Sequence, residues 1–297
     1  MSSNRDLVVV ILATMDDLVV VVTGASAGIG AEIARQATAA GARVALAARR
    51  EPELKAIADE LIGSMAVVVD VTKRSEVERL SAEVIDKYGH YDIWINNVGR
   101  GISRLPSEIT DEDIDTMMEV NVKSALYGMQ VHGHRQAVGF GFTHGLTRRV
   151  GAVISGGHAC VRDGRFCISW TAPLMPPRHR CQVAAAHMKH RGKCQIINIS
   201  SELGRVPTVL PRTAYSGAKH FLNALTDGFR SELAASYPNL AVTSVSPGLT
   251  YTEFHTRARH GGGDGRAIPG GQVTWPLKKC PMLTFFRTKL KKIGRAD

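Results

Sequence analysis

The stretch LVVVVTGASAGIG, Leu18–Gly30, decides the fold of this chain. Its leucine and four valines form a short β-branched run typical of a buried strand, and the residues after it carry apolar side chains at helical spacing. The turn between them contains Gly24, Gly28 and Gly30, which allow the backbone to approach another group closely. Because a helix N-terminus attracts anions, this order of strand, turn and helix predicts a site for a dinucleotide pyrophosphate.

Strands and helices alternate over most of the chain. Short β-branched runs predict strands at Leu18–Val22, Arg43–Ala47, Met65–Val69, Asp92–Ile95, Gln195–Ile199 and Val242–Val245. Stretches with one apolar face predict helices at Ile29–Ala39, Glu51–Leu61, Ser75–Tyr88, Asp111–Met129 and Ala214–Ser236. Right-handed crossovers place such helices on both faces of a parallel sheet. We therefore predict an α/β fold, a Rossmann-type three-layer α/β/α sandwich with a doubly wound sheet, as one domain over residues 1–297.

Composition and charge exclude several classes of protein. With 297 residues, 44% hydrophobic and 22% charged, the chain is neither disordered nor fibrous in composition. Its net charge of +10 is concentrated in residues 131–182 and 273–297, which carry +6 each, so the remainder carries −2. A mildly acidic body argues against a nucleic-acid partner.

Cysteine usage and hydropathy indicate a cytoplasmic protein. The 5 cysteines form no paired framework, which fits a reducing compartment such as the cytosol. The apolar stretch Leu7–Val22 contains Asp16 and Asp17, and two carboxylates in hydrocarbon are costly. We therefore expect no membrane span.

The alternation fails in residues 131–182, which are rich in Gly, Arg and His and contain no Lys or Glu. The sequences on either side would join into one continuous helix followed by a strand. We interpret the segment as an insertion, and its boundary residues fit a retained intron or a faulty gene model. Residues 273–297 form an atypical basic tail, which we interpret in the same way as a product of altered splicing or reading frame. As an alternative, the insertion is a zinc-binding or interaction module, whose possible zinc ligands are His158, Cys160, Cys167, His179 and Cys181. Their spacing matches no paired-ligand pattern, so we predict no metal.

Two arginines follow the second predicted strand. An acidic residue at this point typically binds the ribose hydroxyls of NAD, whereas guanidinium groups suit the 2′-phosphate of NADP. Arg49 and Arg50 therefore predict a preference for NADP. NAD stays an alternative, because the two arginines can also be solvated and Ala27 leaves the glycine turn without a basic residue.

A tyrosine and a lysine provide candidate proton chemistry. Tyr215 and Lys219 stand four residues apart, so both share one face of a helix. A tyrosine has a pKa near 10, and an adjacent ammonium together with a cationic nicotinamide can lower it. Tyr215 is then a general acid in reduction and a base in oxidation. Ser201, at the end of the fifth predicted strand, is placed to polarise a substrate oxygen.

Five motifs follow one another along the chain: the glycine motif, Asn-Asn-x-Gly, a helical asparagine, a serine and Tyr-x-x-x-Lys. In this order they resemble the short-chain dehydrogenase/reductase (SDR) family, and the resemblance runs from about Leu18 to Phe254. The resemblance implies that Ser201, rather than Ser200, is the catalytic serine. It implies further that Asn121 positions a proton-relay water and that Lys219 also binds the nicotinamide ribose. The catalytic set is then Asn121, Ser201, Tyr215 and Lys219. The predicted cofactor-binding residues are Thr23, Gly24, Ser26, Gly28, Ile29, Gly30, Arg49, Arg50, Asp70, Val71, Asn97, Gly99, Tyr215, Lys219, Pro247, Gly248 and Thr252.

These motifs predict an oxidoreductase that transfers hydride between NADPH and a ketone or aldehyde, or the corresponding secondary alcohol. A small-molecule carbonyl or alcohol is the expected partner. The resemblance also implies a homo-oligomer built on the helices of Asn121 and Tyr215, although the insertion interrupts the first of them. The alternative is a catalytically silent binding protein, or a mis-spliced product that residues 131–182 disrupt.

Overall fold

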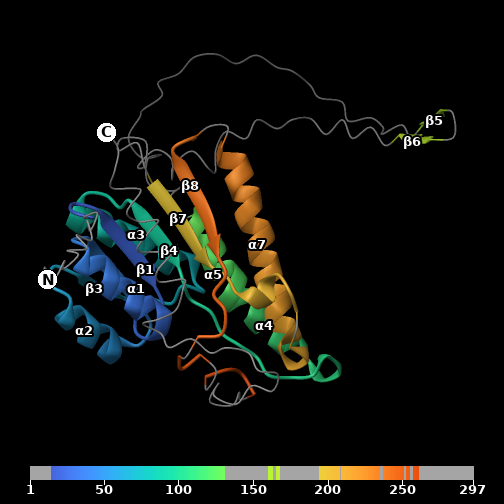
Figure 1. The fold of residues 1–297 in the computed structure, drawn as a ribbon, viewed down its shortest axis with the longest axis horizontal. Helices are drawn as coiled ribbons and strands as arrows, with labels where there is room; N and C mark the ends of the chain where they lie inside the picture. Colours follow the sequence, from blue (N-terminus) through green and yellow to red (C-terminus); the bar gives the residue numbers. More distant parts are fainter. Residues whose placement is uncertain are drawn as a thin grey trace, which may run out of the picture.

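The computed structural model describes residues 15–130, 160–162, 165–167, 194–207, 209–234, 237–250, 252–254 and 257–260. A parallel sheet of six strands organises these residues, in the order β3-β2-β1-β4-β7-β8 (Figure 1). The strands are β1 (Val19–Thr23), β2 (Arg43–Ala48), β3 (Met65–Val68), β4 (Ile93–Asn96), β7 (Cys194–Ile199) and β8 (Leu240–Val245). All six predicted strands are present, with ends shifted by up to two residues.

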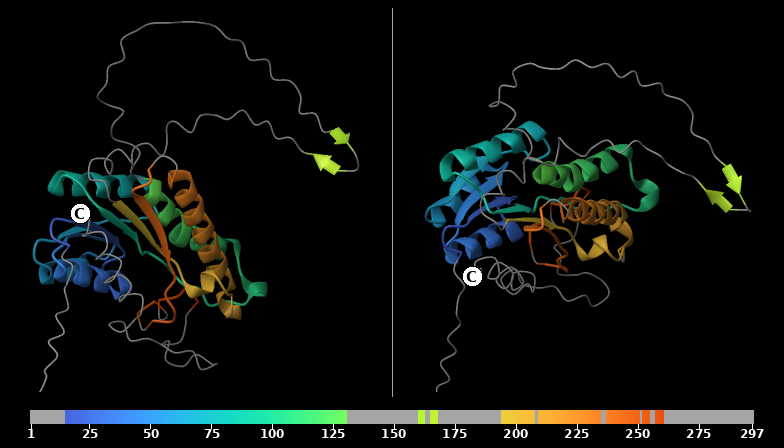
Figure 2. Two further views of the ribbon diagram at one scale, coloured as in Figure 1. Left: turned by 45° about the horizontal axis from the view of Figure 1, so that its top comes forward. Right: turned by 90° about the horizontal axis from the view of Figure 1, so that it is seen from above.

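Helices cover both faces of the sheet, as Figure 2 shows. One face packs against α1 (Gly28–Ala39) and α2 (Glu51–Glu60). The other packs against α3 (Arg74–Tyr88), α5 (Ser124–Gln130) and α7 (Thr213–Ala234). The predicted α/β/α sandwich with a doubly wound parallel sheet is therefore confirmed.

The valines of β1 explain why the sheet lies between two layers. Val20 and Val22 belong to the apolar cluster with α1 and α2, whereas Val19 and Val21 belong to the cluster with α3 and α7. All four are fully buried. A strand covered on both faces needs apolar side chains at every position, so its sequence is a continuous run rather than an alternation.

One predicted helix differs from the structure. The segment predicted as a single helix, Asp111–Met129, consists of α4 (Asp111–Met118), a π-helical turn at Glu119–Lys123 and α5. A π-turn adds one residue to a helical turn and is often found at functional sites. The periodicity of apolar residues predicts helix here but does not distinguish the wider turn, and Asn121 lies within it.

The insertion contains a strand pair that we did not predict. Cys160–Arg162 (β5) and Arg165–Cys167 (β6) pair antiparallel. Asp163-Gly164 separates them in the sequence, and Asp-Gly between two β-prone runs is a strong hairpin signal. The other residues of 131–182, the tail 273–297 and the possible zinc ligands His158, His179 and Cys181 lie outside the described residues, and for β5 and β6 only the backbone is described.

Residues 257–260 pack against the loop after β4 and against α4. Ile102 and Arg259 form an isolated parallel bridge. The carboxylate of Asp113 receives hydrogen bonds from Arg104 at 2.8 Å and pairs with Arg259 and His260. Burial opposes ionisation, but the hydrogen bonds from His260, Thr110 and Arg104 hold the pKa of Asp113 below its ordinary range. This ionic contact fixes the C-terminal segment beside the sheet.

No helix in the described part of the chain is long and apolar enough to cross a membrane.

Candidate active site

A cavity of about 680 Å³ lies at the carboxyl ends of the strands. The order of strands reverses between β1 and β4, and open α/β sheets bind ligands at such a point. Most predicted site residues line this cavity: Gly24, Ser26, Gly28, Ile29, Arg49, Arg50, Asp70, Val71, Asn97, Gly99, Ser201, Tyr215, Lys219, Pro247, Gly248 and Thr252. Thr23, Gly30 and Asn121 do not line it.

The glycine turn has the conformation that only glycine adopts easily. Gly24 and Gly28 have φ of +69° and +58°. A Cβ at Gly30 would lie 2.4 Å from the carbonyl oxygen of Gly24, so α1 packs directly on the turn. Ala27 begins α1 without a side-chain cap, and the first turn contains no acidic residue. The N-terminal N–H groups are therefore available to an anion.

Thr23 and Asn97 connect the ends of β1 and β4 beneath the cavity. The hydroxyl of Thr23 donates to the carbonyl of Ile95 at 3.1 Å and accepts from the backbone N–H of Asn97 at 3.1 Å. The amide of Asn97 donates to the carbonyl of Thr23 at 3.0 Å. Thr23 therefore supports the turn rather than forming the cavity wall.

The arginines after β2 lie at the glycine-turn end of the cavity. Arg50 donates through Nη2 to the hydroxyl of Ser26 at 2.9 Å and through Nη1 to Glu53 at 3.0 Å. Glu253 lies 3.7 Å from the same guanidinium. Arg49 is exposed. Two guanidinium groups therefore lie at the cavity mouth beside the turn, and that of Arg50 is paired with glutamates.

Tyr215 lies at the other end of the cavity, near the start of α7. Only 6% of its surface is exposed, and burial raises its pKa to about 12. A hydrogen bond with the side chain of Ser201 and the charge of Arg212 offset part of this shift. The neighbouring Ser200 is instead turned toward the backbone of α7, with its hydroxyl 3.5 Å from the carbonyl of Lys219. The structure thus brings Ser201, not Ser200, to the phenol.

Lys219 is buried beneath Tyr215. Its Nζ donates to the carbonyl of Ile199 at 2.9 Å and lies 5.8 Å from the centre of the Tyr215 ring. Burial lowers its pKa to about 7. In this arrangement the lysine does not bring the pKa of Tyr215 below its ordinary value, which differs from the activation we expected from their spacing alone.

Asn121 supports the wall of the cavity from behind. Its amide donates to the carbonyls of Arg100 at 3.0 Å and Met117 at 3.2 Å, and its carbonyl accepts from the N–H of Arg100 at 3.0 Å. A Cβ at Gly99 would lie 3.1 Å from Asn121 Oδ1 and 3.5 Å from Lys219 Nζ. Glycine at this position therefore leaves a narrow gap between the asparagine and the lysine.

The remaining predicted residues occupy loops at the cavity edge. Asp70 accepts from the N–H and hydroxyl of Thr72 at 3.1 and 2.8 Å, which fixes the loop after β3. The carbonyl of Pro247 accepts from the N–H of Glu202 at 3.0 Å, which joins the loops after β8 and β7. Thr252 accepts from the N–H of Phe254 at 3.3 Å.

Sequence reasoning missed two cavity residues beside the phenol. Phe254 packs its ring 5.4 Å from the ring of Tyr215, centre to centre. Arg212 lines the same end of the cavity. Neither belongs to a recognised motif, and the only sequence signal for Arg212 is its position three residues before Tyr215.

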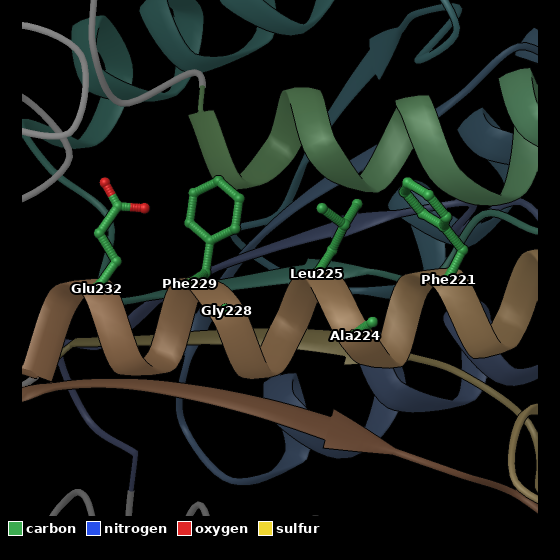
Figure 3. Close-up of a pocket in the computed structure, with 6 residues that line it drawn as sticks. All are labelled: Phe221, Ala224, Leu225, Gly228, Phe229 and Glu232. Atoms are coloured by element: carbon green, nitrogen blue, oxygen red, sulfur yellow. The ribbon is translucent and has the colours of Figure 1, made fainter. Parts of the chain in front are cut away.

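A second hollow, of about 370 Å³, lies along α7 away from this site (Figure 3). It is lined by Phe221, Ala224, Leu225, Gly228, Phe229 and Glu232. Phe221 is 48% exposed. This is the helix on which the homo-oligomer was expected, and that expectation stays a prediction.

A family model for short chain dehydrogenases matches residues 18–134 and 172–262. The chain therefore belongs to the short-chain dehydrogenase family, as its motifs indicated, and is an oxidoreductase of this family that acts on CH–OH groups. An uncharacterised oxidoreductase of Staphylococcus epidermidis is 28% identical over 242 residues, which cover 81% of each chain.

Solved structures with the same fold contain nicotinamide cofactors. An alcohol dehydrogenase of the archaeon Thermococcus sibiricus, complexed with 5-hydroxy-NADP, has a TM-score of 0.65 at 20% identity and covers 94% of this chain and 92% of its own. A variant of the actinorhodin polyketide ketoreductase with NADPH has a TM-score of 0.58 at 26% identity, covering 79% and 71%. A 3-ketoacyl-(acyl-carrier-protein) reductase of Brucella melitensis with NADH has a TM-score of 0.64 at 20% identity, covering 91% and 90%.

Proposed function

We propose that this protein reduces a ketone or aldehyde with NADPH and oxidises the corresponding secondary alcohol in reverse. One observation carries the proposal: the glycine turn with Arg49 and Arg50 lies at one end of a single cavity, and Ser201, Tyr215 and Lys219 lie at the other. A dinucleotide laid along this cavity has its phosphates at the turn and its nicotinamide beside the phenol.

The residues at the turn fit the cofactor. The uncapped N-terminus of α1 would hold the pyrophosphate, and Gly24 and Gly28 would allow its close approach. Asp70 and Val71 would border the adenine, whereas Asn97, Gly99, Pro247, Gly248 and Thr252 would surround the nicotinamide half; all of them line the cavity. The nicotinamide supplies the hydride and, when oxidised, a positive charge near Tyr215.

A preference for NADP rests on the two arginines. Arg50 is held toward the turn by Ser26, and Arg49 is exposed at the same mouth of the cavity, so both can contact a 2′-phosphate. The ketoreductase at 26% identity, whose structure contains NADPH, supports this choice. NAD is the alternative cofactor.

Tyr215 donates the proton in reduction. Its raised pKa keeps the phenol protonated at neutral pH, which is the form that a general acid needs. Ser201, hydrogen-bonded to Tyr215, orients the substrate carbonyl. Lys219, with a pKa of about 7, exchanges protons readily near neutrality, and Asn121 holds the loop of Arg100 behind it. The proton given up by Tyr215 is replaced through this side of the cavity.

The test is the oxidation of NADPH with a panel of carbonyl compounds, comparing the full chain with Tyr215→Phe. We expect Tyr215→Phe to lower kcat about 10²- to 10⁴-fold, because it removes the proton donor. Binding of NADPH, followed by the fluorescence of its nicotinamide, should stay within about 2-fold. Turnover that survives in Tyr215→Phe overturns the assignment.

The same assay separates the enzyme from a catalytically silent binding protein. A silent protein binds NADPH without consuming it for any carbonyl compound. A full chain that does not bind NADPH contradicts both alternatives.

A further inference from the structure

Arg212 is an unusual cation in the catalytic cavity. It ends a short 3₁₀-helix, Leu210–Arg212, directly before α7. Its Nη1 atom is closed to solvent and has no hydrogen-bond partner. Burial lowers the pKa of the guanidinium, and the nearby Tyr215 offsets part of this shift without forming an ion pair with it. A guanidinium stays charged at neutral pH, and no carboxylate of the described residues forms an ion pair with Arg212, so among these residues its positive charge is uncompensated.

The position of Arg212 is fixed by its surroundings. A Cβ at Gly101 would lie 2.7 Å from Arg212 Nη1 and 3.0 Å from the ring of Phe254. The guanidinium and the phenyl ring therefore meet over Gly101, next to Tyr215. The backbone of the 3₁₀-helix is held by the N–H of Arg104, which donates to the carbonyl of Pro211 at 2.9 Å.

The other arginines of the cavity are either paired or hydrated. Arg50 is bonded to Ser26 and Glu53, and Arg257 pairs with Glu253 at 3.0 Å. Arg49 and Arg100 are exposed, so water hydrates them. A partly buried charge without a partner is unfavourable, and a ligand that supplies the opposite charge gains from it.

The walls beside Arg212 are apolar. Leu203, Val206, Val209 and Phe254 line this end of the cavity. A ligand beside Arg212 therefore meets a cation and apolar side chains, and Glu202 and Arg100 also line the cavity. A carboxylate matches the planar guanidinium better than a spherical anion because it accepts two parallel hydrogen bonds.

We propose that Arg212 selects an oxo acid with an apolar chain as the substrate. This inference rests on the proposed function and names its substrate class. The carboxylate binds Arg212, the chain lies against the apolar wall, and the carbonyl reaches Ser201 and Tyr215. The carbonyl carbon then accepts the hydride of NADPH, and its oxygen accepts the proton of Tyr215. The products are a hydroxy acid and NADP⁺, with the carboxylate unchanged.

Matched acids and esters test the inference. The kcat/KM values of the full chain for acetoacetate and levulinate are compared with those for their methyl esters. We expect the acids to be preferred at least about 10-fold, since charge-assisted hydrogen bonds are lost in the ester. Arg212→Gln should remove this preference by raising KM for the acids at least about 10-fold more than KM for the esters, and Arg212→Lys should restore part of it.

Arg205→Gln is the matched control, because Arg205 is an exposed arginine of the same loop that does not line the cavity. It should keep the wild-type ratio of acid to ester. Equal use of acid and ester by the wild type, or an unchanged ratio in Arg212→Gln, overturns the inference. Turnover of the esters in that case leaves the proposed function intact.

A binding experiment distinguishes failure of this inference from failure of the proposed function. Calorimetric titration of the full chain, with NADPH present, compares pentanoate with methyl pentanoate. Tighter binding of pentanoate that disappears in Arg212→Gln supports the carboxylate site even when no carbonyl is reduced, and then only the proposed function fails. Equal binding of the two compounds overturns the inference whatever the turnover.

Discussion

At the scale of single residues, burial sets the chemistry of Lys219 and Tyr215. The motif spacing predicted that both lie on one helical face, and they do. It did not predict that desolvation raises the pKa of Tyr215 and lowers that of Lys219. Desolvation depends on the loops that close over a side chain, and Phe254 and Arg212 approach from segments that carry no motif.

Lys219 should make stability depend on pH. Its pKa is about 7 in the folded protein and about 10.4 when unfolded, so the unfolded chain binds one more proton between these values. The free energy of unfolding should then rise with pH across this window by up to about 1.4 kcal/mol per pH unit from this group. Denaturant unfolding from pH 7 to 10 should show this rise in the wild type and less of it in Lys219→Met. The same dependence of the unfolding free energy on pH in the wild type and in Lys219→Met would contradict the lowered pKa of Lys219.

The arginines after β2 should determine the choice of cofactor. Replacing both, as Arg49→Ala with Arg50→Ala, should weaken NADPH binding about 10- to 100-fold, because charge-assisted hydrogen bonds to the 2′-phosphate are lost. NADH, which lacks this phosphate, should bind within about 3-fold of the wild type. Fluorescence titration with both nucleotides measures the ratio. Equal losses for NADPH and NADH would instead mean that the arginines support the turn.

At the scale of elements, the sequence predicted the alternation of strands and helices but not the π-turn. Periodic apolar residues predict that 111–129 is helical, and the structure agrees on each side of Glu119–Lys123. The extra residue in the turn is decided by tertiary contacts: Asn121 bonds to Arg100 and Met117 at the same time. Such a contact joins segments that sequence reasoning treats separately.

The packing of α5 on β4 should tolerate no added methyl group. A Cβ at Gly128 would lie 2.0 Å from Asn96 Oδ1 and 2.7 Å from Trp94 Nε1, both buried. Gly128→Ala should therefore lower the free energy of unfolding by about 1–3 kcal/mol, measured by denaturant titration.

The matched control is Gly217→Ala in α7, where a Cβ would meet no atom within 4 Å. Alanine is favoured over glycine inside a helix, so this change should be neutral or stabilise by up to about 1 kcal/mol. A Gly128→Ala protein as stable as Gly217→Ala would show that α5 moves freely against the sheet.

At the scale of the whole molecule, the fold was predictable because its alternation of elements survives on both sides of residues 131–182. The family match leaves out 135–171, within this segment, and the interpretation of an insertion stays a prediction. Hydrophobic patterning cannot predict what those residues do, because they show no helical or strand period beyond the short β5–β6 pair.

A chain that joins Gln130 directly to Val183 should keep the activity. The helix α5 ends at Gln130, whose side chain accepts from Arg74 of α3 at 2.7 Å, so the body of the domain is anchored before the insertion begins. We expect the joined protein to bind NADPH and reduce carbonyls at least as well as the full chain, with a Tm that is equal or higher. Thermal melts and turnover of both proteins test this. If the joined protein no longer binds NADPH, residues 131–182 are required for the folded, cofactor-binding domain.

The contacts of Asp113 form in a fixed order during synthesis of the chain. Arg104 is made 9 residues before Asp113, whereas His260 follows it by 147. While the ribosome is still producing the middle of the chain, the carboxylate has only its early partners, Arg104 and Thr110. The segment that carries Phe254 to the phenol gains its contact with Asp113 when Arg259 and His260 emerge. A nascent chain therefore completes its catalytic cavity late, after all six strands of the sheet have been made.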